Sequence, residues 1–81
     1  MITPRQIRAA RALALIGQIE LAERAGIGVA TLRRIEAAVD EITGTAQSVM
    51  RIQRALEEAG IVFIDQDGTS GPGVRLRHRT P

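Results

Sequence analysis

The sequence predicts a mainly α fold, in which a bundle of four helices is followed by a C-terminal β-hairpin. Two observations support this fold class. Up to residue 60, apolar residues recur at helical spacing in four segments, three of which end close to a glycine. After residue 60 the pattern changes to a short β-branched and aromatic run, a glycine-rich turn and an alternating segment, which is typical of a hairpin. We therefore divide the chain into a helical domain, residues 1–60, and a hairpin with a tail, residues 61–81.

The first two helices are short and lie next to each other in the sequence. Thr3 can cap the first helix with its hydroxyl group, and Pro4 suits the first helical position because its missing N–H has no partner there anyway. The apolar spacing continues to about Leu15, and Gly17 then interrupts the pattern. We expect the second helix over Gln18–Ala25, with one apolar face.

The third helix follows after a very short connection. Gly26 is the expected left-handed residue at the end of the second helix, and Gly28 precedes the third, which we expect from Val29 to about Ala38. Because so few residues separate them, the two helices must meet at a sharp bend. After a loop, Thr45 can cap a fourth helix over Ala46–Ala59, which carries a single apolar stripe.

The hairpin is predicted from two strands around a turn that extends from Asp67 to Gly73. The first strand, Ile61–Ile64, is continuously apolar and is expected to be covered on both faces. In the second, Val74 and Leu76 alternate with Arg75 and Arg77, so this strand should have one buried and one solvated face. Four helices can cover only one face of a strand, so we assign the other face to a second subunit or another protein. The residues of this predicted dimer or partner interface are Ile61, Val62, Phe63 and Ile64. The alternative is a hairpin that folds wholly onto its own core.

Length and composition restrict the class of protein. With 81 residues and 44% apolar content, the chain fits one compact domain. So short a chain buries only about 60 to 65% of the surface that its unfolded form exposes, which makes a stabilising homodimer a natural expectation.

Several functions are disfavoured by residue types. The chain has no cysteine, which excludes disulfides, a thiol nucleophile and cysteine-ligated metal sites, and its one histidine, His78, lies in the tail. Glu57 and Glu58 are adjacent on a helix and so point in different directions. We therefore expect neither an enzyme nor a bound metal or cofactor. Arginines interrupt the apolar pattern of the first residues, which predicts no signal peptide, no membrane span and a cytoplasmic protein.

Positive charge is concentrated in the first half of the chain. All eleven basic residues are arginine, a residue suited to phosphate and guanine contacts, although the coding bias of a GC-rich genome would give the same composition. Residues 1–36 hold six arginines and three glutamates, whereas residues 37–81 hold five arginines and six acidic residues. This asymmetry is a weak indication of a nucleic-acid partner.

The segment from Gln18 to Glu36, QIELAERAGIGVATLRRIE, carries the most specific pattern. It resembles the helix-turn-helix of the lambda-repressor-like family, also called the XRE or Cro/C1 type, and the wider resemblance covers about Thr3–Ala59. Ten positions match in register: Gln18, Leu21, Ala22, Ala25, Gly26, Ile27, Thr31, Leu32, Ile35 and Glu36. Several have physical reasons, because Ala22 must be small where two helices nearly touch and Gly26 must adopt a positive φ.

The resemblance implies that the helix beginning at Val29 lies in the major groove of double-stranded DNA. The predicted DNA-binding residues are Gln18, Gly28, Val29, Ala30, Thr31, Arg33 and Arg34. Arg34 would donate two hydrogen bonds to guanine, and Val29 and Ala30 would pack on thymine methyl groups. Gln18 would bind a phosphate at the start of its helix. The alternative is that Arg33 and Arg34 are merely solvated surface charges.

The resemblance also implies an ion pair with a structural role. Many members of the family pair an arginine of the first helix with a glutamate at the end of the third. Arg11 and Glu36 occupy these positions, and we therefore exclude both from the DNA-contacting set.

Two functions follow as hypotheses. The first is a transcriptional regulator, a repressor that binds a palindromic operator as a homodimer. The second is a protein-interaction module, such as an antitoxin or an anti-activator, that binds a protein partner through the hairpin and has weak or no DNA binding. The second is favoured by three departures from the family pattern. Gly17 and Gly28 stand where serine or threonine usually caps a helix, and Ile19 stands where a polar residue is usual.

Overall fold

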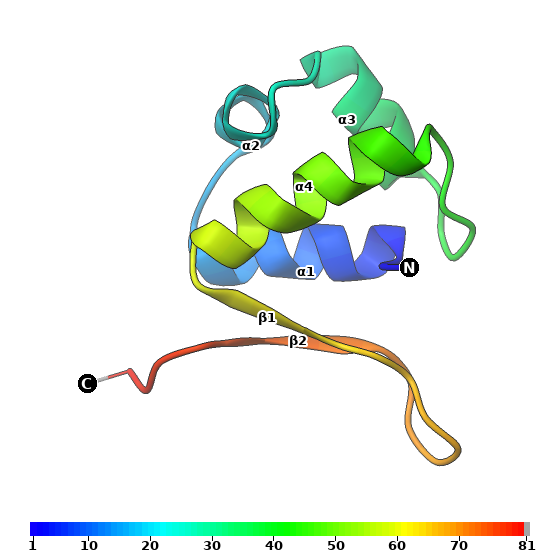
Figure 1. Ribbon diagram of the computed structural model, residues 1–81, viewed down its shortest axis with the longest axis vertical. Coiled ribbons are helices and arrows are strands. Elements are labelled where there is room, and N and C mark those ends of the chain that lie inside the picture. The colour runs from blue at the N-terminus through cyan, green and yellow to red at the C-terminus, as the bar shows by residue number, and fades with distance from the viewer. Residues whose placement is uncertain (81) are drawn as a thin grey trace.

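The computed structural model describes residues 1–80, and over this range the chain forms four helices and one antiparallel hairpin (Figure 1). This confirms the predicted fold class. The elements are α1 Pro4–Ala14, α2 Gln18–Ala25, α3 Val29–Ala37, α4 Ala46–Glu58, β1 Ile61–Ile64 and β2 Gly73–Leu76.

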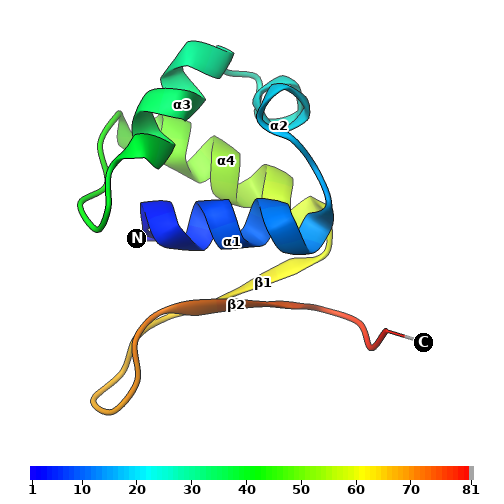
Figure 2. The ribbon, with the colours of Figure 1, turned by 180° about the vertical axis from the view of Figure 1, so that it is seen from behind.

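The hairpin and the α2–α3 pair lie on opposite sides of the molecule. The two strands contact α1 and α4, whereas α2 and α3 pack against the other side of these helices. Figures 1 and 2 show the same arrangement from front and back, with the hairpin below α1 and with α2 and α3 above it. The molecule therefore has a helix-turn-helix end and a hairpin end.

A single apolar core joins the helices and the first strand. Its largest fully buried side chains come from all four helices and from β1, namely Ile7, Leu21, Leu32, Ile35, Val49, Ile52, Leu56 and Ile61. They follow the helical spacing of the sequence, so each helix turns one apolar face inwards.

The end of α1 differs from the expected glycine stop. Leu15 adopts the left-handed conformation with a φ of 59°, whereas Gly17 is extended and precedes α2. The N–H of Ile16 donates to the carbonyl of Arg11 at 3.2 Å, and the Ile16 side chain is buried. Burial of Ile16 therefore turns the chain at Leu15, although a left-handed leucine costs about 1 to 2 kcal/mol.

The loop between α3 and α4 makes a close approach to the core. Gly44 has a φ of 89°, and a Cβ atom built there would lie 3.0 Å from Cδ1 of Ile35. Position 44 therefore requires glycine for two reasons, backbone conformation and space.

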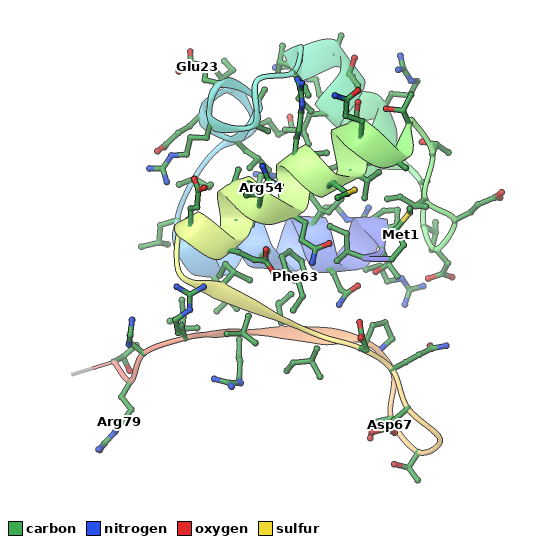
Figure 3. All side chains as sticks on the ribbon, viewed as in Figure 1. Met1, Glu23, Arg54, Phe63, Asp67 and Arg79 are labelled. Carbon is green, nitrogen blue, oxygen red and sulfur yellow. The ribbon has the colours of Figure 1, made fainter. Side chains whose placement is uncertain are left out.

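The hairpin turns one face towards the helices. Ile61 pairs with Leu76 and Phe63 pairs with Val74, and these four side chains pack on or within the core. Figure 3 shows Phe63 between the hairpin and the helices. One face of the predicted first strand is thus covered by the chain itself.

The other face of the hairpin points away from the helices. Val62 lies opposite Arg75, and Ile64 lies opposite Gly73. Val62 is half-buried and Ile64 is 42% exposed. Neither Val62 nor Ile64 packs against the apolar core, so the expected coverage of Ile61–Ile64 on both faces would need a second molecule.

The turn of the hairpin is organised by Asp67. Its Oδ1 accepts hydrogen bonds from the N–H groups of Thr69 and Ser70, both at 2.8 Å, and from the Thr69 hydroxyl at 3.0 Å. The hydrogen bond from the Thr69 N–H is the main cause of a lowered pKa of the Asp67 carboxyl. This aspartate therefore belongs to the turn, as predicted from the glycines around it.

A buried glutamine fastens the hairpin to α1. Gln6 is only 4% exposed, and its Nε2 donates to the carbonyls of Ile64 at 3.1 Å and Gly73 at 2.9 Å, one from each strand. Its Oε1 accepts from the N–H of Thr3 at 2.8 Å, while the Thr3 hydroxyl accepts from the N–H of Gln6. The same side chain thus completes a capping box and holds both strands.

We predict that Gln6→Ala lowers the free energy of unfolding by about 2 to 3 kcal/mol, because three side-chain hydrogen bonds of about 1 kcal/mol each are lost. Urea unfolding followed by circular dichroism measures the change. Gln47→Ala, at an exposed position of α4, is the control and should stay within about 0.5 kcal/mol of the parent chain. Equal effects of the two variants would contradict the role of Gln6.

Candidate nucleic-acid interface

The bend between α2 and α3 is built from main-chain hydrogen bonds around one glycine. Gly26 ends α2 with a φ of 70°, and its N–H donates to the carbonyl of Glu23 at 3.2 Å. The N–H of Ile27 donates to the carbonyl of Ala22 at 3.0 Å. These bonds close α2 in the pattern of a left-handed cap, and α3 starts three residues later. The chain therefore contains two short helices joined by a tight turn (Figure 1).

Helix α3 has a buried face and an exposed face. Leu32, Ile35 and Glu36 point into the molecule. Of the residues predicted to contact DNA, the exposed ones are Gly28, Ala30, Arg33 and Arg34, and the half-buried ones are Gln18, Val29 and Thr31. Val29 also packs against the core, so only part of its surface is open to a ligand.

The N-terminal ends of α2 and α3 present free main-chain donors. Gly17 and Gly28 occupy the cap positions and have no side chain that can accept from the first N–H groups. The positive ends of both helix dipoles are therefore available to an anion. At the start of α2, Ile19 is 61% exposed, which places apolar surface beside these donors.

A buried ion pair connects α1 to α3. The guanidinium of Arg11 donates to Glu36 in a two-pronged arrangement, from Nε to Oε2 and from Nη2 to Oε1, both at 2.8 Å. The side chain of Glu36 is 3% exposed and that of Arg11 is 21% exposed. The hydrogen bonds that Arg11 donates to Glu36 raise the pKa of Arg11 further above its ordinary value, against the opposing effect of burial. The structure thus contains the pair that the resemblance implied.

The buried carboxylate also holds the first residue of α2. Nε2 of Gln18 donates to Oε1 of Glu36 at 3.2 Å, and Oε1 of Gln18 accepts from Nε of Arg33 at 3.3 Å. Within residues 1–80, every buried side-chain nitrogen and oxygen has a hydrogen-bond partner. Four side chains from three helices therefore form one connected network, of which the sequence analysis found only the Arg11–Glu36 pair.

A second arginine of α1 caps the end of α3. Nη1 of Arg8 donates to the main-chain carbonyls of Glu36 and of Ala38, the latter at 2.9 Å. Cations are favoured at this end of a helix because the last carbonyls lack partners there. The sequence analysis missed this contact, although the spacing of three between Arg8 and Arg11 puts both on one face of α1.

Arg34 differs from its neighbours on α3. Among the described residues, no hydrogen bond or ion pair holds its guanidinium group, whereas Arg33 is bound to Gln18. Arg24 of α2 also has a partner, because it forms an exposed ion pair at 2.5 Å with Glu20, one helical turn earlier. Arg34 is therefore the arginine of α3 whose guanidinium group has no partner among the described residues.

Other kinds of site were also sought in the described part of the chain. Residues 1–80 contain no group of three histidine, aspartate or glutamate side chains placed to hold a metal ion. None of the helices in this range has the length and apolar character required to cross a membrane.

Comparison with protein-family models gave no match, and comparison with curated proteins gave none at significant similarity. The resemblance to the lambda-repressor-like family, as distinct from the fold itself, therefore stays a prediction.

We predict that Arg11→Met lowers the free energy of unfolding by about 2 to 4 kcal/mol, because it leaves the Glu36 carboxylate buried without its cation. The loss is smaller than for a fully buried pair, since Arg11 is partly solvated. Arg24→Met removes the same charge from the exposed pair with Glu20 and should cost at most about 0.5 kcal/mol. Urea unfolding of both variants measures the difference. Similar losses of unfolding free energy in the two variants would show that the buried ion pair contributes no more to stability than the exposed one.

Proposed function

We propose that this chain is a sequence-specific regulator of transcription that binds double-stranded DNA, with α3 in the major groove. The observation that carries the proposal is the division of α3 into a buried apolar face and an exposed face that bears Arg33 and Arg34, directly after a tight turn from α2. Helix-turn-helix proteins present their recognition helix to DNA in this way.

The dimensions and donors of α3 suit this role. With its side chains an α-helix is about 10 to 12 Å across, and the major groove is about 12 Å wide, so the first turns of α3 can enter between the phosphate backbones. Arg34, whose guanidinium is free, can donate two hydrogen bonds to O6 and N7 of guanine. The exposed Ala30 and the open part of Val29 can pack on thymine methyl groups.

Phosphate binding is supported by the main chain and by Arg33. The open N–H groups at the starts of α2 and α3 are the donors that helix N-termini offer to phosphate. Arg33 adds a fixed positive charge beside the start of α2, since it is bound to Gln18 there. Contacts of this kind set the position on DNA and do not distinguish sequences.

One recognition helix contacts too few base pairs for tight specific binding. We therefore propose that two copies bind a palindromic operator with half-sites about 34 Å apart, and that occupation of a promoter represses transcription.

A second candidate function is a protein-interaction module. The observation that favours it is exposed apolar surface, at Ile64 on the outer face of the hairpin and at Ile19 beside the proposed phosphate contacts. Purification of the chain with a stoichiometric protein partner, together with no DNA binding by the chain alone, would support this candidate over the first.

We predict a gel shift and a protected footprint on DNA that flanks the gene of this protein. Arg34→Ala should weaken specific binding about 5- to 150-fold, which corresponds to the roughly 1 to 3 kcal/mol of a bidentate guanine contact. The control is Arg79→Ala, which removes the same charge at the end of the molecule remote from α3 (Figure 3). Absence of a protected site at moderate salt, or equal effects of the two variants, would contradict the proposal.

A further inference from the structure

Gln18 lies between a buried charge and a surface charge. Its Nε2 donates to the carboxylate of Glu36, which is buried, and its Oε1 accepts from Nε of Arg33, which is exposed. The carboxylate of Glu36 is in turn fixed by the two hydrogen bonds from Arg11. The Gln18 amide therefore holds the long, exposed side chain of Arg33 in place relative to the fixed carboxylate of Glu36.

Only one orientation of the amide fits these two neighbours. A carboxylate accepts hydrogen bonds and a guanidinium only donates them, so the amide nitrogen must face Glu36 and the amide oxygen must face Arg33. A rotation of the amide by half a turn would place oxygen against oxygen and donor against donor. Glutamine is suited to this position because it carries a donor and an acceptor on one planar group.

We propose that Gln18 is a positioning residue, which orders Arg33 for contact with the DNA backbone in advance of binding. The inference rests on the proposed DNA-binding function and changes the role of Gln18 within it. The resemblance assigned Gln18 itself to a phosphate, whereas the hydrogen bonds commit one of its amide N–H groups to Glu36 and its oxygen to Arg33. Arg33 keeps its terminal nitrogens for the phosphate, since only Nε is used by Gln18.

The size of the effect follows from side-chain entropy. Ordering a long side chain at an interface costs about 0.5 to 1.5 kcal/mol, and this cost falls on binding only when the side chain is disordered beforehand. Loss of Gln18 should therefore weaken DNA binding about two- to tenfold. The loss should act through Arg33 alone.

A double-mutant cycle tests this dependence, with a 20-base-pair duplex of mixed sequence as the probe and fluorescence anisotropy at low salt as the measurement. We expect Gln18→Ala to weaken binding about two- to tenfold in the parent chain and to have almost no effect in an Arg33→Ala background. In an Arg34→Ala background the full effect should persist, which makes the adjacent arginine a matched control. Equal effects of Gln18→Ala in the Arg33→Ala and Arg34→Ala backgrounds would overturn the proposal, because Gln18 would then contact the phosphate directly.

A measurement without DNA separates this inference from the proposed function. In the free protein, the Nε–H signal of Arg33 should have a high heteronuclear NOE, which Gln18→Ala abolishes, while that of Arg34 stays low in both proteins. Circular dichroism shows that the variants are folded at the temperature used. A mobile Arg33 in the parent chain, or an ordered one in Gln18→Ala, would overturn the positioning role. Failure of the parent chain to bind any duplex would instead overturn the proposed function.

Discussion

The carboxylate of Glu36 is the buried charge on which the arrangement of the first three helices depends. A buried carboxylate is very costly unless its oxygens are satisfied, and here the partners come from Arg11 of α1 and Gln18 of α2, while Glu36 itself belongs to α3. A shift of any one helix would leave charge or donors unpaired. The ion pair therefore specifies how α1, α2 and α3 meet, in addition to the apolar contacts between them.

The two ends of α3 differ, because the C-terminal end is held by contacts with the rest of the chain and the N-terminal end is open. At the C-terminal end, Arg8 binds the last carbonyls, and Gly44 allows the following loop to close against Ile35. At the N-terminal end, Gly28 leaves the first N–H groups without a side-chain cap. A ligand at that end would meet free donors on a helix that does not have to move, which is the condition for recognition with little ordering cost.

Spacing and caps predicted the helices and strands, because these are local properties. Thr3, Thr45 and Gly26 act at the element ends as predicted. The contacts of Gln6 with the strands, of Arg8 with the end of α3 and of Gln18 with α3 were not predictable in this way. Their partners lie 15 to 67 residues away and depend on how the elements pack. The Thr3-x-x-Gln6 spacing indicates a capping box, yet it does not indicate that the same amide reaches both strands. Leu15 was unexpected because burial of Ile16, a tertiary effect, overrides the local preference for glycine.

The position of the hairpin limits how two copies could bind the proposed operator. The hairpin lies on the side of the molecule away from α3 (Figure 1), and Val62 and Ile64 of its outer face do not pack against the core. If two copies packed face to face through this outer face, the two-fold axis that relates them would lie in the plane of the interface. The two α3 helices would then lie at opposite ends of the dimer and face in opposite directions. A dimer on one palindrome needs an axis that runs from the hairpin end to the α3 end, and hence contacts along the sides of the molecule. If the chain binds one palindromic operator as proposed, its two copies should therefore contact each other along the sides of the molecule and not through the outer face.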